Sequence, residues 1–70
     1  MKRNRLKVLR AECRITQIDL ALKVGLSRDR YWHIENGYAE PTDAERARLA
    51  KALRVEDAAL GFAVMEARAS

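Results

Sequence analysis

The sequence has few of the residues from which metal and cofactor sites are built. A single cysteine, Cys13, and a single histidine, His33, occur among its 70 residues. One cysteine excludes an internal disulfide and a thiolate zinc cage, and one histidine removes most other metal-site schemes. We therefore expect no metal and no cofactor, and a reducing cytoplasm as the compartment.

Glycine, proline and long apolar runs are also scarce. No apolar run approaches the roughly 20 residues that a membrane span needs, and the charged start over residues 2–5 is unlike a secretory signal. A second histidine or cysteine, a glycine-rich phosphate loop and a carboxylate pair in a cleft are all missing. The sequence therefore predicts a protein that is not an enzyme and is neither secreted nor inserted in a membrane.

Apolar residues recur at helical spacing, and alanine, leucine and arginine are abundant. A chain of 70 residues cannot divide its core in two, so we expect a single domain over residues 1–70. The predicted fold class is all-α, a compact bundle of four or five short helices. Small scaffolds without disulfides often gain stability by self-association, which favours a dimer.

Capping residues and glycines predict where the helices begin and end. Thr16 and Ser27 are caps for the second and third helices, and Gly25 supplies the positive φ of the tight turn between them. Residues 16 to 37 thus form a helix-turn-helix, ended by Gly37. The other expected helices run from about Arg3 to Cys13, from Pro41, Thr42 and Glu45 to about Leu53, and from about Glu56 to Arg68.

The third expected helix has one apolar and one polar face. At about 100° per residue, Tyr31 and Ile34 fall on one side of it. The other side combines a guanidinium, a carboxylate, an indole, an imidazole and an amide, from Arg28, Asp29, Trp32, His33 and Asn36. A set so rich in donors and acceptors suits the edges of bases in the DNA major groove.

The net charge of +4 suits a polyanionic partner without proving one. Residues 1–14 hold six basic residues and one acidic residue, whereas residues 15–37 hold three of each. The positive field is therefore N-terminal. Because the helix-turn-helix itself is nearly neutral, its specificity must come from geometry.

Several motifs together resemble the phage-repressor and Cro-type helix-turn-helix family. They are Leu6, Leu9 and Arg10, then Thr16-Gln17, Leu20-Ala21, Val24-Gly25-Leu26-Ser27-Arg28, Ile34-Glu35-Asn36-Gly37, Pro41 and Leu49 to Leu53. The resemblance covers about residues 5 to 60. It implies a lambda-repressor-like bundle, a homodimer that binds a palindromic operator in double-stranded DNA, and a place on the nucleoid in the cytoplasm. It also lays residues 28 to 36 in the major groove.

The resemblance implies roles for single residues. The base-reading candidates are Arg28, Asp29, Trp32 and His33, and the phosphate-binding candidates are Gln17 and Asn36, joined through their charge by Arg5, Arg14 and Arg30. Arg10 and Glu35 are expected to form a partly buried structural ion pair. Four alternatives stay open: Arg28 contacts a phosphate or is simply solvated, Asp29 stabilises the first helical turn, Trp32 packs over Asn36 or Arg28, and Asn36 bonds the helix end.

Some residues depart from the family pattern. Ile18 and Leu22 stand on the outer face of the second helix, where relatives usually carry charge, so we expect something to cover them. In the last helix one apolar arc caps the bundle, while Phe62 and Met65 form the dimer interface. Arg14 and Arg54 stand where relatives often have glycine, so either they are left-handed or their helices end differently.

Two functions are compatible with these features. The first is a sequence-specific DNA-binding transcriptional regulator, either a Cro-like repressor or a controller protein of a restriction-modification system. The alternative is a protein-binding module, such as an antitoxin that masks a toxin. Its contact surface would be Ile18, Leu22, Phe62 and Met65.

Overall fold

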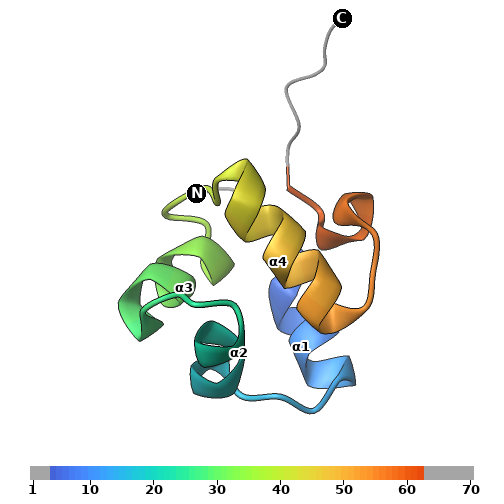
Figure 1. Cartoon of the computed structure of the whole chain (residues 1–70), viewed down its shortest axis with the longest axis horizontal. Coiled ribbons are helices and arrows are strands. Elements are labelled where there is room, and N and C mark those ends of the chain that lie inside the picture. The colour runs from blue at the N-terminus through green and yellow to red at the C-terminus, as the bar shows by residue number, and fades with distance from the viewer. Residues whose placement is uncertain (1–3, 63–70) are drawn as a thin grey trace, which may run out of the picture.

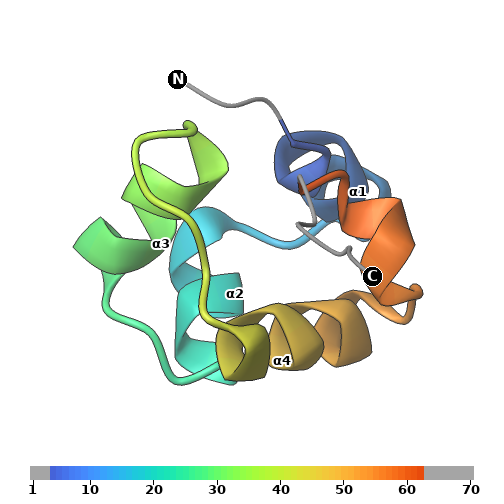
Figure 2. The ribbon, with the colours of Figure 1, turned by 90° about the horizontal axis from the view of Figure 1, so that it is seen from above.

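The computed structural model describes residues 4–62, which form four α-helices, one 3₁₀ helix and no strand. The elements are α1 (Leu6–Glu12), α2 (Gln17–Lys23), α3 (Arg28–Glu35), α4 (Asp43–Leu53) and the 3₁₀ helix η1 (Asp57–Leu60). Helices α2 and α3 lie together on one side of the molecule, α1 and η1 lie on the other, and α4 runs across both (Figures 1 and 2). The all-α fold expected from the sequence is confirmed.

One apolar core receives side chains from all five elements. The buried residues are Leu6, Leu9, Leu20, Ala21, Val24, Tyr31, Ile34, Leu49, Ala50, Leu53 and Leu60. Tyr31 and Ile34 are fully buried, as the helical spacing predicts. Helix α3 is therefore held by its apolar face, which leaves its polar face toward solvent.

The expected caps of the helix-turn-helix are present. The hydroxyls of Thr16 and Ser27 each accept a hydrogen bond from the backbone N–H three residues on, at 3.1 and 3.0 Å. Gly25 and Gly37 have φ of 74° and 84°, which is the left-handed region that favours glycine. These local signals fix the angle at which α3 leaves α2.

Helix α1 is shorter than the expected Arg3 to Cys13. The side-chain oxygen of Asn4 accepts from the backbone N–H of Leu6 at 2.9 Å, so the chain turns there before the helix begins. Arg14 ends the segment with φ of 56°, and Arg54 after α4 has φ of 60°. Of the two alternatives for these arginines, the structure has the left-handed one.

The helix expected from Glu56 to Arg68 is wrong over residues 56–62, and its remainder lies outside the described residues. Within residues 56–62 only η1 is helical, and Gly61 follows it in a left-handed conformation with φ of 79°. The carbonyl of Leu60 accepts from the backbone N–H of Arg5 at 2.8 Å. The last carbonyl of η1 is thus hydrogen-bonded to the residue before α1, and not to a further helical turn.

Candidate nucleic-acid interface

The polar face of α3 is exposed along its whole length. The structure brings the four base-reading candidates, Arg28, Asp29, Trp32 and His33, together on this face, and all four are exposed. Tyr31 and Ile34 hold the opposite face in the core. The helix therefore presents a mixed set of donors and acceptors from a fixed support.

Two side chains of this face bond to the backbone of their own helix. The ring Nδ1 of His33 lies 2.6 Å from the carbonyl oxygen of Asp29. A carbonyl can only accept, so Nδ1 is the donor of this bond, and in a neutral imidazole Nε2 would then be the acceptor. The side-chain amide of Asn36 donates to the carbonyl of Trp32 at 2.9 Å. Asn36 thus makes the helix-end bond while staying exposed.

Trp32 packs on a residue that sequence reasoning missed. Its indole stacks on the ring of Tyr38, with centroids 5.7 Å apart and planes inclined by 9°. Tyr38 follows the turn at Gly37, where no helical period exists to reveal it. The indole remains 43% exposed, so the stack orients Trp32 without hiding it.

Glu35 stands at the centre of a hydrogen-bonded cluster that joins three helices. Its carboxylate accepts from Arg10 Nε at 2.9 Å, from Gln17 Nε2 at 2.8 Å and from the Tyr31 hydroxyl at 2.6 Å. The ion pair expected between Arg10 and Glu35 is thus present, and the Glu35 side chain is 3% exposed. Gln17 at the start of α2 is thereby fixed to the end of α3.

The cluster shifts the pKa of its members. Burial alone would raise the pKa of Glu35, but hydrogen bonds from Arg10, Tyr31 and Gln17 outweigh it and lower that pKa. Burial, and then the Glu35 carboxylate, raises the pKa of Tyr31, so the phenol stays protonated as a donor. The carboxylate is therefore charged, and three side chains donate hydrogen bonds to it.

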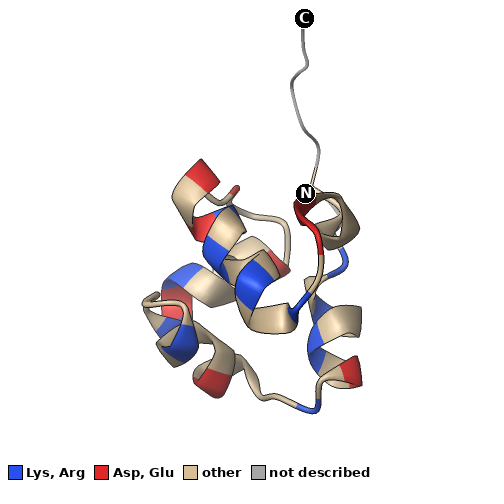
Figure 3. Ribbon diagram, turned by 45° about the vertical axis from the view of Figure 1, so that its right-hand side comes forward, with Lys and Arg blue, Asp and Glu red and all other residues tan. Residues whose placement is uncertain are grey.

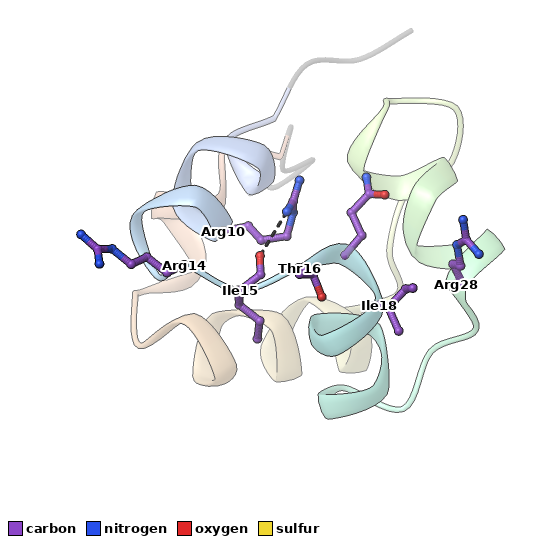
Figure 4. A pocket seen from close by; sticks show the side chains of 7 residues that line it. Arg10, Arg14, Ile15, Thr16, Ile18 and Arg28 are labelled. Carbon is purple, nitrogen blue, oxygen red and sulfur yellow. Dashed lines mark hydrogen bonds between the residues drawn. The ribbon is translucent and has the colours of Figure 1, made fainter.

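A groove of about 410 Å³ runs between the end of α1, the start of α2 and the start of α3 (Figure 4). Its lining residues are Arg10, Arg14, Ile15, Thr16, Gln17, Ile18 and Arg28. Arg10 is held by Glu35, whereas Arg14 and Arg28 have no ion-pair partner within residues 4–62. Because no acidic side chain lines the groove, it offers free positive charge beside the polar face of α3.

Arg30 does not belong to this surface. Its guanidinium donates to Glu45 at 2.8 and 3.3 Å and to the carbonyl of Glu40 at 3.0 Å. The hydrogen bond with Glu45 raises the pKa of Arg30. Arg30 thus links α3 to the start of α4, and because its side chain is still 36% exposed, its phosphate contact stays a prediction.

Three further candidates lie apart from the groove or outside the described residues. Arg5 precedes α1 and packs its side chain beside Gly61. Phe62 is half-buried against the core of its own chain, and Met65 lies outside the described residues. Of these, only Arg5 and the exposed part of Phe62 are available on the described surface.

A second groove, of about 460 Å³, is basic but shares no residue with the first. It is lined by Lys23, Arg48, Lys51, Ala52 and Arg54. Basic residues follow one another along α4 (Figure 3). Lys23 and Lys51 stand in the last turns of α2 and α4, where cations stabilise the helix dipole. Their charge therefore has a structural reason.

Within residues 4–62, no group of three histidine, cysteine or carboxylate side chains is placed to hold a metal ion. Within the same residues, none of the helices has the length and apolar character needed to cross a bilayer.

Comparison with known proteins points to one class. The profile of a helix-turn-helix family of the Cro/C1 type matches residues 6–60. Among solved structures, the chain is similar to the restriction-modification controller protein C.AhdI from Aeromonas hydrophila, with 31% sequence identity and a TM-score of 0.74. That match covers 79% of this chain and 83% of the controller chain. No sequence among the curated proteins matches the present chain.

Proposed function

Because the chain belongs to the Cro/C1-type helix-turn-helix family and is a DNA-binding transcriptional regulator, we propose that it binds a palindromic operator as a homodimer. In this proposal α3 enters the major groove of each half-site. The two recognition helices then lie about 34 Å apart, one turn of the duplex.

One observation carries the proposal. Tyr31 and Ile34 are fully buried on the inner face of α3, whereas the base-reading candidates on its outer face are all exposed. Base readout needs side chains that are held in place before the DNA arrives, because each hydrogen bond must meet one base edge. An anchored helix with a free polar face beside a positive groove fits that need.

Each exposed side chain of α3 has a matching group on DNA. Arg28 can donate to guanine O6 and N7 together, a contact that discriminates by roughly 1 to 3 kcal/mol. Asp29 and the Nε2 acceptor of His33 suit the amino groups of cytosine and adenine. The exposed edge of Trp32 contacts a thymine methyl or a sugar. Specificity thus falls mainly to Arg28.

Phosphate contacts set the register of α3. We assign them to Gln17, Asn36 and Arg14, with Arg5 at the flank. Gln17 is fixed by Glu35, so its position is coupled to that of α3 itself. A phosphate that bonds Gln17 would therefore place the recognition helix as well.

The dimer is expected to form at the end of the molecule that carries Phe62, with Met65 contributing from beyond the described residues. A dimer that overlaps the polymerase site on its own promoter would repress its own gene. Similarity to a restriction-modification controller protein supports a controller of this kind, and a Cro-like repressor is the related possibility. Either would act on the nucleoid, in the cytoplasm.

Selection of bound sequences from random DNA, followed by equilibrium binding and mass measurement, tests the proposal. The protein should select a palindrome and bind it with two chains per duplex. Arg28→Ala should lose most of the preference for the palindrome over a scrambled duplex. Arg48→Ala is the matched control, because it removes the same charge from an exposed position on α4 outside the groove.

Two results would refute it. Equal affinity of the wild-type protein for the selected and scrambled duplexes would rule out base reading. A monomer mass at every protein concentration, on and off DNA, would rule out the dimer.

A further inference from the structure

Ile18 is an exposed apolar side chain in the basic groove beside α3, where the other apolar lining residue, Ile15, is half-buried. It is the second residue of α2, and 49% of its surface is exposed. Single exposed apolar residues are common on protein surfaces. What distinguishes Ile18 is its position, because it lines the same groove as Gln17 and Arg28. Leu22, one turn further along α2, is 73% exposed and does not line that groove.

The neighbours of Ile18 are the residues assigned to DNA. Figure 4 places Ile18 between Thr16 of the α2 cap and Arg28 of α3. Gln17, the adjacent residue, is the proposed phosphate contact. A duplex that satisfies both Gln17 and Arg28 would therefore have to cover Ile18.

The chemistry of the major groove limits what Ile18 can meet there. Among the base edges, the 5-methyl group of thymine is the one apolar feature that the groove displays. A β-branched side chain is stiff about χ1, so little freedom is lost when it packs. Both groups are apolar, so contact between them removes apolar surface from water.

We propose that Ile18 reads a thymine methyl group close to the guanine that Arg28 reads, so that each half-site contains this thymine. The inference rests on the proposed function and adds a specificity-determining residue from outside the recognition helix. It also assigns an occupant to the exposed face of α2 at Ile18, namely DNA.

Replacing thymine by deoxyuridine in the selected operator tests this contact, because it removes the methyl group and keeps the base pair. Each thymine is replaced in turn, and affinity is measured for wild-type, Ile18→Ala and Leu22→Ala proteins. At one thymine per half-site the replacement should weaken wild-type binding about fourfold, the value expected for one buried methyl group. Ile18→Ala should lose this penalty, and Leu22→Ala should keep it.

The outcomes separate the inference from the proposed function. If the wild-type protein prefers the selected operator but Ile18→Ala keeps every uridine penalty, the role of Ile18 is overturned and the function stands. A partner protein covering Ile18 would give that same result. If the wild-type protein shows no sequence preference, both fall. Far-ultraviolet circular dichroism and melting confirm that the variants are folded.

Discussion

Arg10 and Arg28 line the same groove but have different roles, because within residues 4–62 only Arg10 is ion-paired. Arg10 is bound by the buried carboxylate of Glu35, whereas Arg28 has no ion-pair partner in the described chain. Removing Arg10 would strand a buried charge, while removing Arg28 would remove a contact to DNA. Glu35 also holds Gln17, so one carboxylate supports both the fold and the proposed phosphate contact.

Protonation of Glu35 should therefore destabilise the protein. Its pKa is lowered from the ordinary 4.5, so its contribution to stability is fully present above that pH and is lost as the pH falls through the lowered pKa. Glu35→Gln removes this titration. In urea unfolding below about pH 4.5, the free energy of unfolding should fall more steeply for wild type than for Glu35→Gln. The lowered pKa of Glu45 affects both proteins equally, so parallel curves would contradict the account.

Helix ends were predictable where the signal is local, and they were not where it is distant. Thr16, Ser27 and Gly25 act on residues next to them, and the structure has each cap and turn as expected. The end of η1 depends on a bond between Leu60 and Arg5, which are far apart in sequence. Apolar spacing alone favoured a longer helix there, because a local pattern cannot indicate a hydrogen bond to a residue that is distant in sequence.

Gly61→Ala distinguishes the observed turn from the expected helix. An added Cβ at Gly61 would lie 3.0 Å from Arg5 Cγ and 3.2 Å from Arg5 N, at a φ of +79°. We expect a loss of stability greater than the 1–2 kcal/mol or so of left-handed strain alone. Gly25→Ala is the matched control, since it has φ of +74° and nothing within 4 Å. Thermal unfolding that shows stabilisation by Gly61→Ala would indicate a continuous helix instead.

At the scale of the whole molecule, the sequence predicted which face carries the site but not every residue on it. Helical periodicity predicted which side of α3 is buried and which is exposed, and the structure confirms this division. It could not reveal that Arg30 turns to Glu45, or that Tyr38 stacks on Trp32, because both depend on how loops fold back. Net charge was a poor guide, since part of it lies on α4, away from the groove.

In the proposed function, α3 reads bases in the major groove through Arg28. The most direct measurement replaces each operator guanine by 7-deazaguanine, which lacks the N7 acceptor but keeps its pairing, and compares wild-type with Arg28→Ala binding. One guanine per half-site should be sensitive, with affinity reduced about fivefold for wild type, as for the loss of one of two hydrogen bonds, and unchanged for Arg28→Ala. Wild-type binding that is indifferent to every replacement would contradict the account.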